Sequence, residues 1–394
     1  MKFLILNADY PDFLQWLYAR HHDLAARPYA EQMRLRQESL YGVADFYSSN
    51  LRAIGHEAED VYANNEWLQK TWAAEQGIAY DLTGAMSGTA VSVLERVKKA
   101  VRKMPMRPLT SYVRSWLPVR QALPTWLYDI LRSQIERYKP DILLNQAVDA
   151  IPGQFIKKVK PYVRLIVGQH AATRLSESED YGGYDLMISS FPPTVAWCQQ
   201  KGLRAYQCRL GFEPRVLSTL LSTEELFDVT FSGNLFSVHR SREVWLEGVS
   251  RLVPQLKMWG PDIQRLAPTS PLRNHYAGSA WGRDMYQVLR ASKITLNHHG
   301  DVAPFANNMR LFEATGVGTC LITDWKQNLG EMFEVGKELA AYRSMEECAE
   351  LVQYYLAHEE EREAIGRAGQ ARTLREHTYS NRMQEFIRIV EQHV

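Results

Sequence analysis

The chain has 394 residues, of which 45% are hydrophobic and 11% aromatic. It is long enough for two or three domains with cores of their own, and its apolar content excludes an intrinsically disordered chain. Its 46 Lys and Arg residues balance 45 Asp and Glu residues, which argues against a protein built around a nucleic-acid backbone.

The N-terminal segment predicts a buried strand rather than an export or membrane signal. Asn7 and Asp9 interrupt the apolar run that follows Lys2, whereas a signal peptide needs at least about seven apolar residues and a membrane-spanning helix about 20. The four cysteines lack C-x-x-C spacing, so they are interpreted as reduced thiols. We therefore expect a cytoplasmic protein.

Short apolar runs alternate with helical patterns along the chain, which predicts parallel β-α-β units. The expected strands of the first half are Lys2–Ala8, His56–Tyr62, Asp141–Asn145, Tyr162–Gly168, Asp185–Ser189 and Arg204–Cys208. Apolar residues at helical spacing predict a helix over Trp126–Tyr138, which ends before Pro140.

The second half repeats this alternation. Its expected strands are Asp228–Asn234, Gln255–Trp259, Lys293–Asn297 and Thr319–Thr323, and its expected helices are Arg240–Leu252, Gly282–Ala291 and Asn308–Thr315. Pro214 and a stretch rich in Ser, Thr and Leu separate the two series. We expect one domain over 1–218, a second over 219–378, and a last helix over 379–394.

The segment 92–104 departs from the alternation because its pattern predicts a basic amphipathic helix, with apolar residues on one face and Lys and Arg over the rest. Such a helix can lie on an anionic membrane surface or meet an acidic partner. The alternative, which we favour, is an ordinary solvated helix packed on its domain.

The sequence predicts no bound metal and no cofactor. His298 and His299 are adjacent, and adjacent residues of a strand point to opposite faces, so the pair does not easily chelate one ion. A D-x-D motif, which could clamp a divalent metal, occurs nowhere in the chain.

The stretch from Ile294 to Asp324 predicts a ligand site. It is expected to form a strand, a polar loop, a short helix with a glycine C-cap at Gly316 to Gly318, and a second strand. The loop follows the carboxyl end of a parallel strand, where open α/β sheets bind ligands. The candidate binding residues here are Asn297, Asp301, Asn307, Asn308, Met309, Arg310 and Glu313.

The chemistry of these residues suits a nucleotide, which has both phosphate groups and a ribose. Asn307 or Asn308 can cap the short helix and leave its free N–H groups for an anion, to which Arg310 adds a forked cation. Glu313, one turn further, is a poor neighbour for phosphate alone. Its carboxylate suits two adjacent hydroxyls, as on a ribose.

The same stretch resembles the C-terminal nucleotide-binding motif of GT-B glycosyltransferases, in the CgeB-like branch of the group 1 glycosyltransferases. An N-x-R-x-F-E-A-x-x-x-G block, an apolar strand and an E-x-F-x-x-G-x-E loop carry the resemblance. The matching residues are Asn308, Arg310, Phe312, Glu313, Ala314, Gly318, Glu331, Phe333, Gly336 and Glu338. The resemblance is good over 230–394 and fair over the first half.

The resemblance implies an α/β GT-B fold, in which two Rossmann-like domains with parallel sheets face each other across a cleft and the last helix crosses back to the first domain. It implies a nucleotide-sugar donor held by the second domain, with Glu313 on the ribose, and an acceptor met by the first. Many retaining members of this fold carry another glutamate eight positions earlier. Phe305 stands there, so Asp301 or the backbone of 304–307 would serve instead.

Further donor contacts are expected where strands of the second domain end. Gly233 and Asn234 follow its first strand, and a glycine there lets the backbone approach a diphosphate closely. Arg240 and Arg242 can neutralise that diphosphate, or they form a solvated helix face. Trp259 can border the base, or it belongs to the core.

Two residues of the first half are candidate catalytic groups. Asp9 is a candidate general base for an acceptor hydroxyl, and the alternative is a turn or cap residue. His170 is a candidate base or donor-sugar contact, and the alternative is a structural histidine.

Together these features predict a metal-independent glycosyltransferase, of the hexosyltransferase type, that moves a sugar from a nucleotide sugar to an acceptor hydroxyl. The expected acceptors are a glycan, a lipid-linked glycan or a protein, and no nucleic acid is expected as a partner. A nucleotide-sugar 2-epimerase of the same fold and a non-catalytic sugar or nucleotide binder are the alternatives.

Overall fold

The computed structural model describes residues 1–80, 123–171, 175–221, 224–235, 240–260, 263–299 and 304–394. The expected basic helix 92–104 and the candidate residue Asp301 lie outside these ranges.

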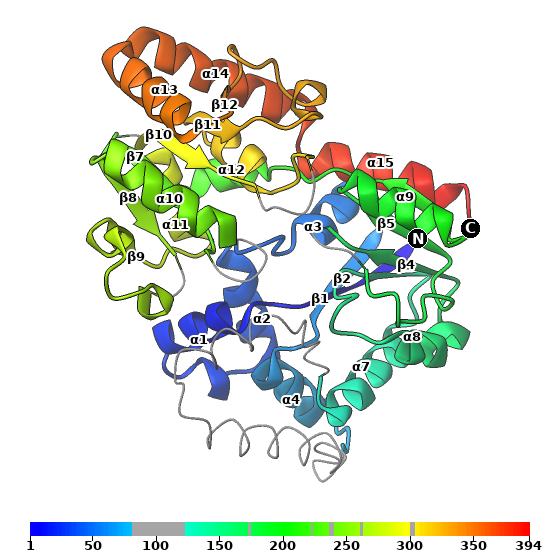
Figure 1. Ribbon diagram of the computed structural model, residues 1–394. Helices are drawn as coiled ribbons and strands as arrows, with labels where there is room; N and C mark the ends of the chain where they lie inside the picture. The colour runs from blue at the N-terminus through cyan, green and yellow to red at the C-terminus, as the bar shows by residue number, and fades with distance from the viewer. Residues whose placement is uncertain (81–122, 172–174, 222–223, 236–239, 261–262, 300–303) are drawn as a thin grey trace, which may run out of the picture. The chain divides into compact units, whose positions relative to one another are not determined.

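The described strands form two six-stranded sheets. The strands pair in parallel, as the sequence predicts. The first sheet contains, in spatial order, β2 (Glu57–Tyr62), β1 (Lys2–Asn7), β3 (Ile142–Asn145), β4 (Leu165–Gln169), β5 (Leu186–Ser189) and β6 (Ala205–Gln207). The second contains β12 (Ala340–Tyr342), β11 (Cys320–Asp324), β10 (Ser292–Asn297), β7 (Phe227–Ser232), β8 (Leu256–Trp259) and β9 (Tyr276–Gly278). In Figure 1, β8, β7, β10 and β11 follow one another in the spatial order of the second sheet.

Helices connect the strands in both halves of the chain. The first half carries α1 (Pro11–Arg20), α2 (Tyr29–Glu38), α3 (Phe46–Ala53), α4 (Glu66–Glu75), α7 (Thr125–Tyr138), α8 (Gly153–Val159) and α9 (Pro192–Gln200). The second carries α10 (Arg240–Leu252), α11 (Arg283–Arg290), α12 (Arg310–Gly316), α13 (Met345–Ala357), α14 (Glu359–Glu376) and α15 (Tyr379–Glu391).

The expected strands of both halves are present with small shifts of their ends. The expected strand from Tyr162 begins only at Leu165, because Lys160–Tyr162 forms a short 3-10 helix. The short strands β9 and β12, which the sequence analysis did not predict, complete the second sheet.

The described chain divides into two compact units. The first comprises Met1–Met33, Glu57–Gln169 and Leu175–Leu186, and the second comprises Arg34–His56, His170–Arg174 and Met187–Val394. The second unit therefore holds the whole second sheet together with helices from both halves of the chain.

The second sheet has a topological switch point between β7 and β10. The chain starts this sheet at β7, adds β8 and β9 on one side, and then returns to the other side with β10, β11 and β12. Phe231 is paired with Leu296, so both strands end at the same level, at Ser232 and Asn297. Open α/β sheets bind ligands at the carboxyl ends of strands where the order reverses in this way.

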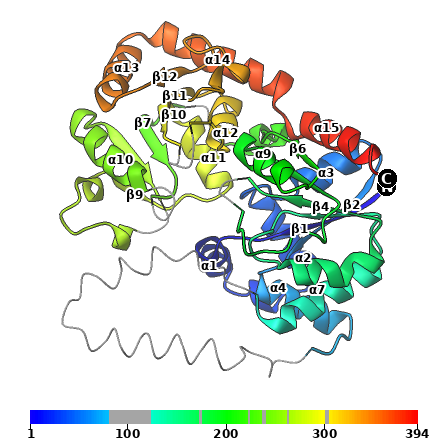
Figure 2. The same cartoon turned by 45° about the vertical axis from the view of Figure 1, so that its right-hand side comes forward.

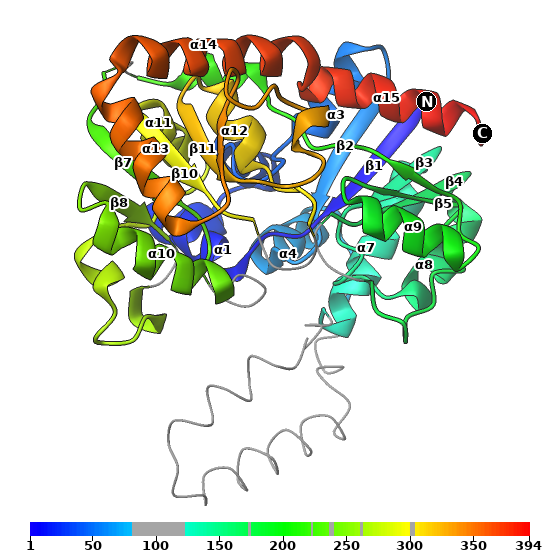
Figure 3. The same ribbon diagram turned by 45° about the horizontal axis from the view of Figure 1, so that its top comes forward.

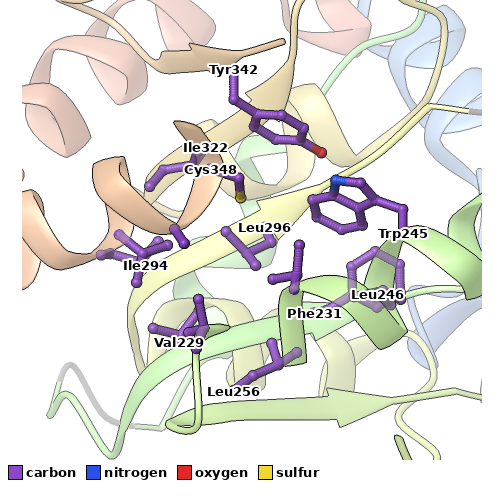
Figure 4. Packing of buried hydrophobic residues seen from close by; sticks show 14 of the residues in the cluster. Val229, Phe231, Trp245, Leu246, Leu256, Ile294, Leu296, Ile322, Tyr342 and Cys348 are labelled. Atoms are coloured by element: carbon purple, nitrogen blue, oxygen red, sulfur yellow. The ribbon is translucent and has the colours of Figure 1, made fainter. Parts of the chain in front are cut away.

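One apolar core holds α10 and α13 against this sheet. Val229, Ile294 and Ile322 of the strands pack with Leu246 of α10 and Cys348 of α13, all fully or almost fully buried. Figure 4 shows these side chains gathered on one face of the sheet. Thr295 alternates with Ile294 and Leu296 in β10 and is also fully buried, so both faces of this parallel sheet are covered.

The short helix α12 packs closely on its neighbours and ends at a glycine turn. Figure 2 shows α12 next to α11. A Cβ atom at Gly316 would lie 2.4 Å from Cγ of the buried Phe212 ring, so only glycine fits there. Gly318 has a φ of +86°, the left-handed conformation that a C-capping glycine adopts, which confirms the predicted cap.

The last helix packs against a helix from the first half of the chain, and both belong to the second unit. α15 packs against α3, and the Tyr379 ring lies 5.2 Å from Phe46 and 5.5 Å from Tyr47; Figure 3 shows the two helices next to each other. Thr378 and Asn381 form a reciprocal capping box at its start. Phe212 fixes the same turn, because its N–H donates to the His377 carbonyl and its own carbonyl accepts from the Tyr379 N–H.

Candidate functional site

A buried ion pair lies at the switch point. Arg310 Nη1 is 2.8 Å from Glu313 Oε2 one turn along α12, and Arg310 Nη2 donates to the carbonyl of Ser232 at the end of β7. The Tyr286 hydroxyl of α11 also hydrogen bonds with Glu313. Burial raises the pKa of Glu313, and Arg310 and Tyr286 act against that rise. The sequence analysis placed Arg310 and Glu313 at this edge but did not detect their partner Tyr286.

Two asparagines join the end of β10 to the start of α12. Asn308 Nδ2 donates to Asn297 Oδ1 at 2.8 Å, and Asn297 Nδ2 donates to the Thr323 hydroxyl of β11 at 2.9 Å. The prediction that Asn307 or Asn308 caps α12 is wrong. Met309 is the N-cap residue, and no side chain makes a capping hydrogen bond, because the two asparagine side chains bind elsewhere.

The loop before α12 contacts the residue that follows His170. The side chain of Asn307 donates to the carbonyl of Ala171. His170 itself is buried, its N–H donates to the Ile188 carbonyl, and its own carbonyl accepts from the Ser189 hydroxyl. The structure thus brings the segments of two predicted site residues together within one compact unit.

Several backbone groups of 304–307, one of the two expected replacements for the missing glutamate, already form hydrogen bonds within the protein. Ala306 exchanges two hydrogen bonds with the Asn328 side chain, and the Pro304 carbonyl accepts from Gln327 N–H. Phe305, at the position of that glutamate, lies edge-on to Phe191 with 6.4 Å between ring centres.

Arg242 bridges the two strand ends that form the switch point. Its guanidinium donates to the carbonyl of Asn234, just after β7, and to the carbonyl of His298, just after β10. Arg242 is buried, so a solvated face is excluded for this residue. Arg240 begins α10, but its side chain lies outside the described part of the structure.

Gly233 and Trp259 pair with each other at the ends of β7 and β8. The Gly233 N–H donates to the Trp259 carbonyl at 3.0 Å, so that N–H is already engaged. The Trp259 side chain is buried and lies edge-on to Phe227, with 5.0 Å between ring centres. Trp259 is therefore part of the packed sheet.

The expected opposite orientation of His298 and His299 is wrong. Both residues lie beyond the end of β10, where strand alternation no longer applies, and both approach the carboxylate of Asp324 at the end of β11. His299 Nδ1 is 2.7 Å from Asp324 Oδ1, and His298 Nδ1 is 3.9 Å from Asp324 Oδ2. Burial raises the pKa of Asp324, but the His299 hydrogen bond and the neighbouring positive charges outweigh burial and hold it well below its usual value.

No group of three or more His, Cys, Asp or Glu side chains within the described ranges has a geometry suited to a metal ion. In the same ranges, no helix is both long and apolar enough to pass through a bilayer.

Asp9 lies in the first unit, in the irregular segment between β1 and α1. Its N–H donates to Asn64 Oδ1 at 2.8 Å, and Asn64 Nδ2 donates back to the Asp9 carbonyl at 2.6 Å. Burial raises the pKa of the nearby Tyr18 to about 12, and the negative charge of Asp9 adds to that rise. Asp9 is buried at the carboxyl edge of its sheet.

Comparison with known proteins identifies the fold. Residues 240–388 match the family model described as "Glycosyl transferase-like". No curated protein sequence matches the chain. Among solved structures, HepE of Anabaena in complex with UDP and glucose aligns over 100% of both chains, with a TM-score of 0.58 and 11% identity.

Two other solved structures also align with nearly the whole chain. A glycosyltransferase of Rickettsia africae aligns over 99% of this chain and 98% of its own, with a TM-score of 0.56 and 11% identity. The sucrose-phosphate synthase of Thermosynechococcus elongatus aligns over 100% and 99%, with a TM-score of 0.53 and 12% identity. The fold is therefore GT-B, with two Rossmann-like parallel sheets.

Proposed function

We propose that the protein is a glycosyltransferase that moves a hexosyl group from a nucleotide sugar to an acceptor hydroxyl. The observation that carries the proposal is the Arg310–Glu313–Tyr286 cluster at the switch point of the second sheet, inside the residues that match the family model. A carboxylate keeps acceptor capacity for vicinal hydroxyls beside its existing partners, as ribose recognition requires.

The fixed cations at the switch point suit a diphosphate. Arg242 and Arg310 are both held by backbone carbonyls of the strand ends. Guanidinium groups fixed in this way stabilise negative charge on a leaving nucleotide without reorganising. The chain has no D-x-D motif, so the proposal includes metal-independent transfer. The finer assignments to the CgeB-like branch, to a glycan, lipid-linked or protein acceptor and to the cytoplasm belong to the same proposal.

A thermal-shift screen with UDP, GDP, dTDP and CMP sugars tests the proposal. We expect one nucleotide class to raise the melting temperature, because binding to the folded state adds stability by mass action, while free sugars have no effect. Stabilisation by a free sugar but by no nucleotide would contradict the proposal. A new sugar epimer formed from the donor alone would point to an epimerase instead.

His170 and Asp9 are proposed to act on the acceptor hydroxyl or the reacting sugar. We expect His170→Ala and Asp9→Ala each to lower kcat by roughly 100-fold or more, the usual contribution of a general base, with donor Kd within about twofold of wild type. Initial rates at saturating donor, with calorimetric donor titration as the control, check this. Wild-type turnover in both variants would refute both roles.

A further inference from the structure

His298 belongs to a stack of rings at the carboxyl edge of the second sheet. The Trp245 indole of α10 lies parallel to His298, with 4.7 Å between ring centres and 11° between planes. The same indole also lies parallel to Tyr342 of β12, at 5.2 Å and 8°, and Figure 4 shows Trp245 next to Tyr342. One indole face therefore covers both rings and fixes the plane of the imidazole.

The hydrogen bonds of the Tyr342 hydroxyl determine which ring nitrogen of His298 carries the proton. The Tyr342 hydroxyl has a single proton, which it donates to the Asn297 carbonyl at 2.8 Å. His298 Nδ1 lies 3.1 Å from the same hydroxyl oxygen, so Nδ1 must carry the proton of this second hydrogen bond. In the neutral ring, Nε2 is then left with a lone pair and no proton.

The ring stays neutral at ordinary pH. Burial lowers the pKa of His298 to about 4, and the positive charges of Arg242 and Lys326 and the neighbouring His299 add to this, while Asp324 opposes it. A base this weak is a poor proton acceptor in catalysis near neutral pH, but its lone pair still accepts a hydrogen bond.

The free nitrogen lies at the switch point and is accessible. No described residue hydrogen bonds to His298 Nε2, and the ring keeps 17% of its side-chain surface exposed. The carbonyl of His298 is held by Arg242, which also holds Asn234 beyond β7. His298 thus stands where the sheet order reverses, the place at which such sheets bind ligands.

We propose that His298 is a sugar-binding residue, whose Nε2 accepts a hydrogen bond from a hydroxyl of the hexosyl group of the donor. This inference rests on the proposed function. A lone pair repels phosphate and carboxylate oxygens, so its partner must be a donor such as a hydroxyl. Fixing the tautomer through Tyr342 makes the site selective, because a sugar without a hydroxyl in reach leaves the nitrogen unpaired.

Two substitutions at His298 distinguish the role of Nδ1 from the role of Nε2. His298→Asn places an amide near Nδ1, where Tyr342 holds it, and removes the acceptor at Nε2. His298→Gln extends an amide oxygen toward Nε2. The probes are the sugar nucleotide that stabilises the protein most in the thermal-shift screen and the matching nucleotide without the sugar, both titrated by calorimetry into each variant.

We expect His298→Asn to weaken sugar-nucleotide binding by roughly 3- to 10-fold, the usual effect of one hydrogen bond, while the nucleotide alone binds within about twofold of wild type. His298→Gln should recover part of the loss. Unchanged binding of both probes, or equal weakening of both, would overturn the inference and leave the proposed function intact. Failure of any nucleotide to bind wild type would overturn the proposed function, and this inference with it.

A measurement on the folded wild-type protein checks the tautomer without a variant. With ¹⁵N-labelled histidine, we expect the Nε2 shift of His298 to be that of an unprotonated ring nitrogen and the Nδ1 shift that of a protonated one at pH 7. Tyr342→Phe keeps the stack and removes the hydroxyl, so the tautomer should become mixed. A protonated Nε2 in wild type would overturn the inference.

Discussion

Replacing Glu313 with alanine is expected to lower the free energy of unfolding by about 3 kcal/mol and to abolish detectable nucleotide binding. Arg310 and Glu313 keep only 12% and 8% of their side-chain surfaces exposed. Removing one member of a buried pair leaves the other charge without compensation, at a cost of about 3–5 kcal/mol. Urea unfolding gives the first quantity, and calorimetric titration with the nucleotide found by the thermal-shift screen gives the second.

Two control variants separate the structural from the ligand-binding part of this effect. Glu313→Gln keeps the shape and an acceptor for Tyr286 but loses the charge, and Tyr286→Phe removes only the hydroxyl. We expect Tyr286→Phe to be the mildest of the three, at about 1 kcal/mol, with nucleotide affinity close to wild type. Full nucleotide affinity in Glu313→Gln, in a stably folded protein, would refute the ribose role.

Gly316→Val is expected to be strongly destabilising, because the added side chain overlaps the Phe212 ring. Three ring atoms would lie 2.4 to 2.6 Å from the new Cβ. Phe212 cannot move away easily, since backbone hydrogen bonds tie it to His377 and Tyr379. Overpacking costs about 1–3 kcal/mol and occasionally more, so we expect about 3 kcal/mol for valine, and less for alanine, in urea unfolding.

The matched control for this substitution is Gly330→Ala. Gly330 is exposed, and nothing lies within 4 Å of a Cβ placed there, so its effect should stay within about 0.5 kcal/mol. In Gly316→Ala, an added Phe212→Leu change should relieve part of the overlap and make the double variant less than additive. Wild-type stability of Gly316→Ala would show that Phe212 is not held as described.

The buried strands could be predicted from sequence because short groups of apolar residues lie between helical patterns, although polar residues such as Thr295 and Thr323 interrupt these groups. β10 and β11 are examples, and both were predicted within one residue of their ends. β9 and β12 were missed. Each has only three residues and lies at an edge of the second sheet, where one neighbouring strand supplies the pairing that its own sequence does not signal.

The location of the candidate site could be predicted from the sequence, but not every hydrogen-bond partner of its residues. Asn297, Arg310 and Glu313 follow recognisable strand and helix patterns at the predicted edge of the sheet, where Arg310 pairs with Glu313 and Asn297 bonds with Asn308. Tyr286 comes from another helix, α11, and no local pattern links it to Glu313. The orientation of His298 and His299 was predicted wrongly because strand alternation was applied to two residues that lie beyond the end of β10.

The pairing of α15 with α3 has a consequence for how the protein is made. Translation produces α15 some 330 residues after the helix that it covers. Until α15 has emerged from the ribosome, Phe46 and Tyr47 lack the Tyr379 ring that packs on them in the folded protein. Synthesis therefore includes a period in which an apolar surface is available to chaperones, and a premature stop codon before Tyr379 would make that exposure permanent.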